Sequence, residues 1–331
     1  MRRIFLLSSE RSGSNLLRSL MERNADVAAP PAAQLLKALL PHCAPGAMGQ
    51  GRAPGPDLLE RVVALTRVHP LPWAPAVTAD DVLERLGAGP WGALALFDAV
   101  YGAYAGKTGK DGYFVKENNV FDFAPLLAQA FPEAGFVYLV RDPRDVFLSF
   151  KKVPGGPNLA RTFAPFWCRE QERCIGFLEG LGGERGVTVR YEDLIEAPDA
   201  VMASLKATLG LAGAASAGSV NDAGAVSTGP YFKNLGGEVL RHNKQKYVTG
   251  LTAAETRLIE VACADLMGRL GYPRDGAAAG AVAMRPAPGV PVRALDRAMS
   301  GGKALYMLRP REILVRIRRH LLYRDIRRAC R

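Results

Sequence analysis

Residues 3–23 read RIFLLSSERSGSNLLRSLMER. The apolar run Ile4–Leu7 is too short for a helix and is typical of a buried strand. Turn and capping residues surround Gly13, and from Leu16 onward the apolar spacing becomes helical. A strand, a Ser/Gly loop and a helix start predict an anion site, because loop amides and the positive end of the helix point at the ligand. Arg11 adds a planar cation suited to phosphate or sulfate.

Composition sets the class of protein. The chain has 331 residues and 48% apolar content, enough for one large or two small α/β domains. Its five cysteines contain no C-x-x-C pair, which argues against a disulfide framework or a zinc site and predicts a cytoplasmic, metal-free protein. The N-terminal apolar run of about four residues is too short for a signal-peptide core. No uninterrupted apolar stretch reaches the length of a membrane span.

The net charge of +11 is unevenly distributed. Residues 303–331 hold ten Lys and Arg against two acidic residues, a net charge of +8. The other 302 residues therefore carry only +3. Because the basic character belongs to the C-terminal tail, the body has no electrostatic support for binding nucleic acid.

Strand and helix patterns alternate along the chain. Further strands are predicted at Gly112–Lys116, Phe136–Val140 and Val187–Tyr191. Helices are predicted at 32–40, 57–68, 79–86, 123–131, 146–151, 160–181 and 198–209. The alternation predicts an α/β fold with a central parallel sheet flanked by helices. The long stretch 28–111 is interpreted as a substrate-side insertion or, equally, as a plain surface subdomain.

Charged residues follow three of the predicted strands. In parallel sheets, ligands bind at the carboxyl ends of the strands, and these ends carry Arg11, Lys116, Arg141 and Tyr191. Taken singly, Lys116 is explained as a solvated strand end and Arg141 as the partner of Asp142 at a helix start. Together, the three cations predict an anionic ligand at one edge of the sheet.

Four segments, in this order and spacing, resemble sulfotransferases that use 3′-phosphoadenosine 5′-phosphosulfate (PAPS). Residues 11–16 (RSGSNL) are similar to the 5′-phosphosulfate loop, and 139–145 (LVRDPRD) with Ser149 are similar to the 3′-phosphate site. Residues 189–194 (VRYEDL) resemble the segment whose tyrosine lies near the adenine. Residues 246–251 (KYVTGL) resemble the C-terminal segment. The similarity spans roughly residues 1–273 and is to the bacterial branch related to tyrosylprotein and carbohydrate sulfotransferases.

The resemblance implies a nucleotide-kinase-like P-loop fold and in-line sulfuryl transfer from PAPS to a hydroxyl or amine, without a metal. The acceptor would be a carbohydrate, lipid-linked, peptide or metabolite group. Arg11 and Lys116 would be catalytic, stabilising charge on the leaving phosphate and on the sulfuryl oxygens. The implied donor-binding residues are Arg11, Ser12, Gly13, Ser14, Asn15, Leu16, Arg141, Ser149, Tyr191 and Lys246.

One departure from the family concerns the catalytic base. Family members often read Pro-Pro-Glu after the first helix, and that glutamate deprotonates the acceptor, but here the sequence is Pro30-Pro31-Ala32. Alternative bases are His42, His69, Glu10, Glu117 and Asp98. The missing carboxylate leaves open a catalytically inactive nucleotide-binding scaffold. A P-loop kinase is disfavoured, because the loop lacks the lysine and second glycine of Gly-x-x-x-x-Gly-Lys-Ser/Thr.

The C-terminal region is expected to be separate from the sulfotransferase-like domain of residues 1–273. Residues 274–302 are rich in Ala, Gly and Pro and are predicted to form a flexible linker. Residues 303–331 are predicted to form a basic amphipathic helix, with Leu314, Ile317 and Leu321 on its apolar side. Such a helix would bind an anionic membrane surface or dock on the body or on a second subunit. The oligomeric state is left open.

Overall fold

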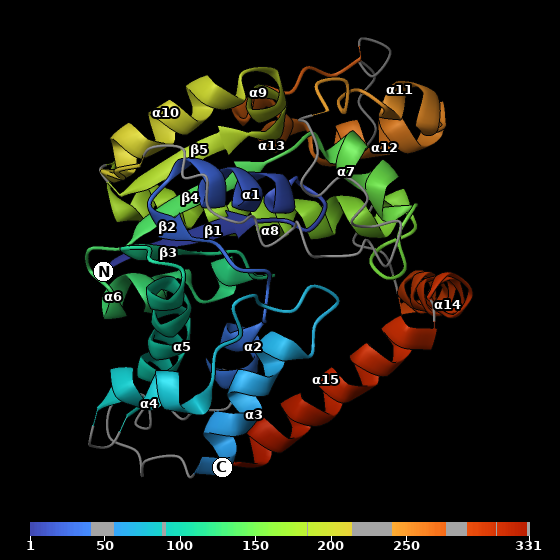
Figure 1. Cartoon of the computed structure of the whole chain (residues 1–331). Coiled ribbons are helices and arrows are strands. Elements are labelled where there is room, and N and C mark those ends of the chain that lie inside the picture. Colours follow the sequence, from blue (N-terminus) through green and yellow to red (C-terminus); the bar gives the residue numbers. More distant parts are fainter. Residues whose placement is uncertain are drawn as a thin grey trace.

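The computed structural model describes residues 1–40, 56–87, 91–183, 185–213, 240–275, 290–308 and 310–329. Its centre is a five-stranded sheet with the strand order β2-β3-β1-β4-β5 (Figure 1). All of its strand pairs are parallel, which confirms the predicted sheet. The strands are β1 Arg2–Ser8, β2 Val27–Ala28, β3 Gly112–Val115, β4 Gly135–Val140 and β5 Gly186–Arg190.

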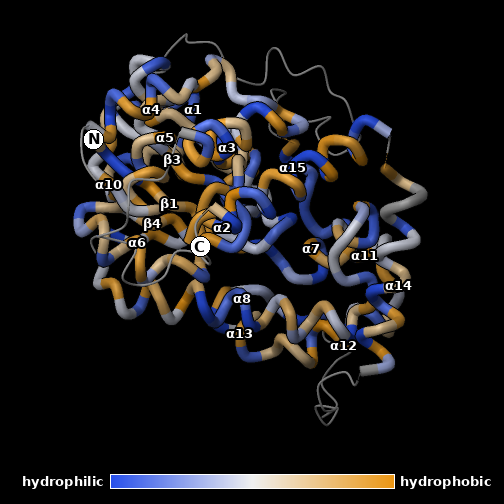
Figure 2. Tube along the Cα trace, turned by 90° about the horizontal axis from the view of Figure 1, so that it is seen from below, coloured by the Kyte–Doolittle hydropathy of each residue, from blue (hydrophilic) through white to orange (hydrophobic). Residues whose placement is uncertain are grey.

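Helices cover both faces of the sheet, as the alternating pattern predicts (Figure 1). One face packs against α1 (Ser14–Asn24), α9 (Tyr191–Glu196) and α10 (Pro198–Leu209), and the other packs against α5 (Ala93–Lys107) and α8 (Ala160–Leu181). Because side chains alternate along a strand, Ile4 and Leu6 enter the first core while Phe5 and Leu7 enter the second. Figure 2 shows the apolar residues concentrated on β1, β4 and α5.

Shorter helices surround this centre. In the insertion they are α2 Leu35–Leu39, α3 Pro56–Arg67 and α4 Ala79–Leu86. A 3-10 turn at Val120–Asp122 and helix α6 Ala124–Ala130 follow β3, and α7 Pro143–Phe150 follows β4. The C-terminal part holds α11 Tyr247–Gly250, α12 Ala253–Ala262, α13 Ala264–Arg269, α14 Val290–Met307 and α15 Pro310–Ala329.

The predicted linker at 274–302 is wrong over residues 290–302, which belong to α14; residues 276–289 lie outside the described part of the chain. Asp296 accepts hydrogen bonds from the backbone N–H groups of Asn158 at 2.8 Å and Leu159 at 3.1 Å, where α8 begins. Lys303 Nζ donates to the Phe150 carbonyl at 2.8 Å. The Gly/Pro-rich composition predicts coil, but these long-range contacts hold the segment as a helix.

Helix α15 docks on the body beside α3 (Figure 1). Arg319, only 9% exposed, and the fully buried Ile326 face inward. Leu314, Ile317 and Leu321, the apolar side identified from the sequence, face outward and are 55%, 51% and 40% exposed. The helix therefore docks through its mixed polar side and leaves its apolar stripe uncovered by the described residues.

Candidate active site

The carboxyl ends of β1, β3 and β4 open into one cavity of about 980 Å³. Three groups of residues line it: the loops after these strands, the insertion, and the docked helix α15. The ten lining residues that the sequence predicted are Arg11, Gly13, Ser14, Asn15, Leu16, Lys116, Arg141, Ser149, Tyr191 and Lys246. Ser12 is the exception, because it is 1% exposed and does not line the cavity. Residues far apart in sequence thus share one site.

The first loop (residues 8–13) enters α1 with an unusual backbone. Arg11 has a φ of 68°, a left-handed conformation that is uncommon for a residue with a side chain and is often found at functional sites. Gly13 precedes the first turn of α1 with a φ of 92°. A Cβ atom at Gly13 would lie 2.2 Å from Cδ2 of Tyr191, so the loop and the tyrosine approach as closely as a glycine permits. The turn presents the N-terminus of α1 to the cavity.

Arg141 connects the first loop to the end of β4. Its Nη1 donates to the Arg11 carbonyl at 3.3 Å, and its Nη2 donates to the Asn243 carbonyl at 2.9 Å. The guanidinium also lies 4.3 Å from the centroid of the Tyr191 ring. Within the described residues, the buried Nε of Arg141 and Oδ2 of Asp145 have no hydrogen-bond partner. The same guanidinium faces a buried carboxylate, since Arg141 Nη2 lies 3.6 Å from Asp145 Oδ2.

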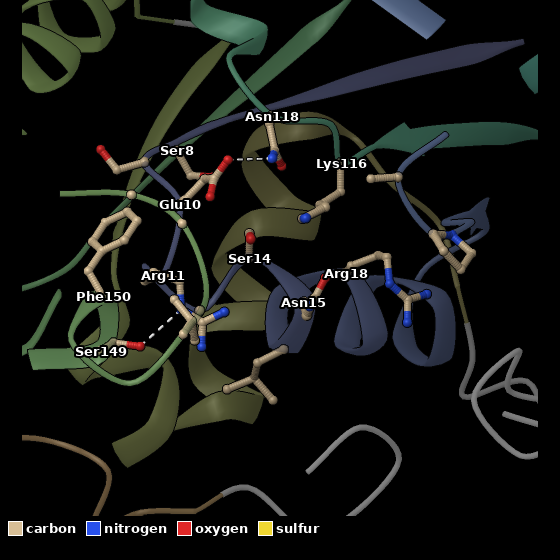
Figure 3. A pocket seen from close by; sticks show the side chains of 18 of the residues that line it. Ser8, Glu10, Arg11, Ser14, Asn15, Arg18, Lys116, Asn118, Ser149 and Phe150 are labelled. Atoms are coloured by element: carbon tan, nitrogen blue, oxygen red, sulfur yellow. Dashed lines mark hydrogen bonds between the residues drawn. The ribbon is translucent and has the colours of Figure 1, made fainter. Parts of the chain in front are cut away.

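Lys116 follows β3, and its side chain points toward Ser14 at the start of α1 (Figure 3). Burial lowers the pKa of Lys116 to about 8. Arg18 and Arg11 lower it further, because like charges disfavour the protonated form, while Glu10 opposes the shift. A lysine held among arginines at a helix N-terminus makes the cavity strongly attractive to anions.

Two of the five candidate bases, Glu117 and Asp98, have carboxylates that are already held by other groups. Both oxygens of Glu117 accept backbone hydrogen bonds, from Leu35 at 2.7 Å and Leu36 at 3.0 Å. Asp98 is not among the lining residues, and it pairs with Arg3 Nε at 2.7 Å. A third candidate, His42, lies outside the described residues.

Glu10 and His69 both line the cavity. Glu10 Oε1 accepts a hydrogen bond from Asn118 Nδ2 at 2.5 Å (Figure 3). His69 is anchored through Nδ1, which lies 2.8 Å from the Leu71 carbonyl oxygen and 3.0 Å from the Leu71 backbone nitrogen. Burial lowers the pKa of His69 to about 3, and the charges of Arg319, Lys116 and Arg18 add to this effect. The imidazole is therefore neutral at physiological pH.

Sequence reasoning missed the contribution of α15 to this site. Glu312, Val315, Arg316 and Arg319 all line the cavity, although nearly 200 residues separate them from Lys116. A basic amphipathic pattern signals a helix but does not identify the surface that the helix covers. Among the described residues, no group of three or more His, Cys, Asp or Glu side chains is placed to hold a metal ion.

Comparison with known proteins identifies this arrangement. A family model described as "Sulfotransferase family" matches residues 3–214, which include the first loop and the ends of β3 and β4. The chain belongs to the sulfotransferase family. The match ends before α14 and α15, so the C-terminal helices of this sulfotransferase lie outside the matched region. None of the curated proteins matches the chain.

Two solved structures show the fold of this sulfotransferase. The sulfotransferase domain from the Synechococcus PCC 7002 olefin synthase has a TM-score of 0.57 and 18% identity, covering 82% of this chain and 95% of that one. The sulfotransferase domain from the curacin biosynthetic pathway has a TM-score of 0.51 and 20% identity, covering 83% and 99%. The nucleotide-kinase-like P-loop fold is thus confirmed. Among the described residues, none of the helices combines the length and apolar content that a membrane span requires.

Proposed function

We propose that this sulfotransferase moves a sulfuryl group from PAPS to a hydroxyl or amine acceptor. The observation that carries the proposal is the convergence of Arg11, Lys116 and Arg141 on one cavity beside the N-terminus of α1. PAPS is a multiply charged anion, and charge-assisted hydrogen bonds are the strong contacts that such a ligand requires. Arg141 fits the proposal, because it lines the cavity beside Tyr191 and its guanidinium is suited to charge-assisted hydrogen bonds with a phosphate.

Each cation has a proposed role in the transfer. Arg11 and the amides at the start of α1 stabilise the negative charge that develops on the 5′-phosphate as the S–O bond to it breaks. Lys116 stabilises the sulfuryl oxygens in the transition state. Arg141 and Ser149 hold the 3′-phosphate, which distinguishes the donor from AMP. Tyr191 would lie beside the adenine, and Lys246 would add positive charge at the 3′ side.

The acceptor is proposed to enter beside the insertion. Its cavity-lining residues 31, 32, 34 and 69–71 are called the acceptor wall below. This wall is mostly apolar, whereas Arg11, Lys116 and Arg141 follow the strand ends. Apolar surface with a few polar groups is typical of sites for small organic ligands. The arrangement supports the interpretation of residues 28–111 as a substrate-side insertion.

The experiment that tests the donor is calorimetry with adenosine 3′,5′-bisphosphate (the bisphosphate below) and AMP, followed by turnover of PAPS. The expected result is tight bisphosphate binding, weak AMP binding, and release of bisphosphate when hydroxyl or amine acceptors are supplied. Equal affinity for the two nucleotides would reject PAPS as the donor. Binding without any turnover would instead support the inactive scaffold. Phosphoryl transfer from ATP would support the kinase, although the first loop lacks the lysine of that motif.

We also propose that the protein is cytoplasmic and contacts an anionic membrane surface through the outward side of α15. Leu314, Ile317 and Leu321 form an exposed apolar stripe there. The exposed arginines of α15 are Arg311, Arg316, Arg318, Arg324, Arg327 and Arg328. They outnumber Glu312 and Asp325, so the exposed surface of the helix carries net positive charge. An apolar stripe on a basic helix suits the interface of a bilayer that contains anionic lipids. The inward side of the same helix lines the cavity, which would place the site close to lipid-linked acceptors.

A further inference from the structure

We propose that His69 is the catalytic base, replacing the glutamate that the family places at residue 32, and that Arg319 of α15 positions it. The inference rests on the proposed sulfuryl transfer and names the residues that serve its acceptor side. Its starting observation is that Ala32 and His69 both line the same cavity. The position that lost the carboxylate and the histidine therefore belong to one wall.

One guanidinium holds both parts of this wall. Arg319 Nη2 donates to the Ala33 carbonyl at 2.6 Å, and Arg319 Nη1 donates to the Val68 carbonyl at 2.8 Å. These carbonyls belong to the residues next to Ala32 and His69 in the chain. Arg319 Nη1 also donates to the Leu65 carbonyl at 3.1 Å, near the end of α3. A rigid, planar fork is suited to holding several acceptors at fixed positions, so Arg319 sets the spacing of residues 32 and 69.

A second contact ties the same two segments together. Trp73 Nε1 donates to the Pro31 carbonyl at 2.7 Å, which joins the chain just after His69 to the residue before Ala32. Within the ring of His69, Nδ1 makes the contacts with Leu71, so Nε2 is the nitrogen left for the cavity. The Leu71 N–H donates to Nδ1 at 3.0 Å when that nitrogen is unprotonated. The base requires the other tautomer, in which Nδ1–H donates to the Leu71 carbonyl 2.8 Å away and Nε2 is free to accept a proton.

The charges around His69 couple it to the donor. Burial and the cations Arg319, Lys116 and Arg18 disfavour the imidazolium in the free protein. The anionic donor would neutralise part of this positive potential at Lys116 and Arg18, which raises the pKa of His69 and strengthens it as a base once the donor is bound. In the step itself, Nε2 takes the proton of the acceptor hydroxyl as the acceptor oxygen bonds to sulfur. The S–O bond to the 5′-phosphate breaks, its electron pair stays on the bisphosphate, and the imidazolium later releases the proton to water.

The test of the base compares His69→Gln, Ala32→Glu and the double variant, with His320→Ala on the exposed side of α15 as the control. The assay is bisphosphate release from PAPS with water and with a panel of hydroxyl and amine acceptors. General-base catalysis contributes about 100- to 10,000-fold, so we expect a loss of at least about 100-fold in His69→Gln. Bisphosphate affinity should stay within about twofold. Partial recovery is expected in Ala32→Glu/His69→Gln, and wild-type turnover in His320→Ala.

Three outcomes would overturn the base assignment. The first is wild-type turnover by His69→Gln. The second is a His69 pKa, measured by NMR in the full chain, that does not rise when bisphosphate binds. The third is a wild-type protein that binds bisphosphate but never releases it from PAPS, which would also favour the scaffold. Failure to bind bisphosphate at all is a different result, because it would reject the proposed donor itself.

The role of Arg319 is tested by Arg319→Ala and Arg319→Lys, with the exposed neighbour Arg318→Ala as the matched control. In Arg319→Ala, the His69 pKa in the free protein should rise from about 3, because the arginine is the largest charge effect that lowers it. Turnover should fall at unchanged bisphosphate affinity, with partial rescue by Arg319→Lys. Parallel losses of melting temperature, bisphosphate affinity and turnover, with an unchanged His69 pKa, would show that Arg319 is only structural and overturn the positioning role.

Discussion

The Nε of Arg11 donates a hydrogen bond to Ser149 Oγ at 3.0 Å, which joins the first loop to the last turn of α7 (Figure 3). The resemblance assigns these residues to different ends of the donor, Arg11 to the 5′-phosphosulfate and Ser149 to the 3′-phosphate. Their contact means that the two proposed phosphate sites would be neighbours. The first loop follows β1 and α7 follows β4, and the pairing of these strands in the sheet brings the two sites together.

Arg141→Ala should weaken bisphosphate binding far more than AMP binding. Hydrogen bonds to charged groups contribute about 1.5–3 kcal/mol, so the expected loss in bisphosphate affinity is about 10- to 100-fold. AMP, which lacks the 3′-phosphate, should lose little. Isothermal calorimetry of the wild type and Arg141→Ala with each nucleotide measures the change in the two affinities.

The matched control is Arg173→Ala, since that arginine is exposed on α8 and does not line the cavity. It should leave both affinities unchanged. If Arg141→Ala lowers the affinities for bisphosphate and AMP equally, then Arg141 does not recognise the 3′-phosphate.

The fall in activity at alkaline pH should reflect the deprotonation of Lys116. Its pKa is lowered to about 8, and the protonated form is the one that stabilises negative charge. Activity is therefore present below this pKa and is lost as pH rises through about 8. Because kcat/KM reports groups of the free enzyme, its pH profile is the measurement to make.

Lys116→Arg separates this group from other titrating residues. An arginine stays protonated across the accessible range, so the loss of kcat/KM above about pH 8 should disappear even if the maximum rate falls. An alkaline limb that persists in Lys116→Arg would assign the titration to another residue.

The parts of the fold that the sequence predicted are those with strong local periodicity. The helices α4, α8 and α10 coincide with their predicted ranges, because their apolar spacing and flanking breakers are local signals. The sequence does not predict strand β2, because a strand of two residues, Val27 and Ala28, is too short to show an alternating pattern. Helix α9 was missed because it continues directly from β5 without a side-chain cap.

The sequence brings the three cations together. On the proposed acceptor side it indicates the insertion at 28–111 but does not single out one base. Topology places Arg11, Lys116 and Arg141 at one sheet edge, so the strand order alone implies their proximity. His69 was only one of several candidates, because its place in the cavity depends on contacts between Arg319 and two distant segments. Such contacts come from tertiary packing and leave no spacing pattern in the sequence.

Gly13→Ala should disrupt the first loop specifically. The residue has a φ of 92°, and the added Cβ would lie 2.2 Å from Tyr191 Cδ2. Tyr191 in turn packs against the Arg141 guanidinium at 4.3 Å. Overpacking costs roughly 1–3 kcal/mol, so we expect a lower free energy of unfolding and at least about a tenfold loss of bisphosphate affinity.

Gly109→Ala is the matched control for this variant. Gly109 also has a positive φ, of 67°, but a Cβ there meets no atom within 4 Å. Both variants should lower the free energy of unfolding, because alanine disfavours a positive φ. Only Gly13→Ala should also lose bisphosphate affinity. Similar affinities in the two variants would contradict the proposed tight approach of Tyr191 to the loop.

The outward side of α15 should bind vesicles that contain anionic lipid. Leu314, Ile317 and Leu321 are exposed there, while Arg319 and Ile326 hold the helix to the body from its other side. Replacing the three exposed residues together by serine should therefore abolish flotation with phosphatidylserine vesicles without lowering the melting temperature. Each cation near the surface contributes roughly 1 kcal/mol, so flotation of the wild type should also weaken at high salt.

The control for this variant is Leu83→Ser, which removes an apolar residue of α4 that is 43% exposed. It should float like the wild type. A wild-type protein that stays unbound to anionic vesicles at low salt would rule out the membrane contact. If the same protein sediments as a dimer and the triple serine variant as a monomer, the apolar stripe is instead covered by a second copy of the chain, because an exposed apolar stripe of this kind is also typical of a subunit interface.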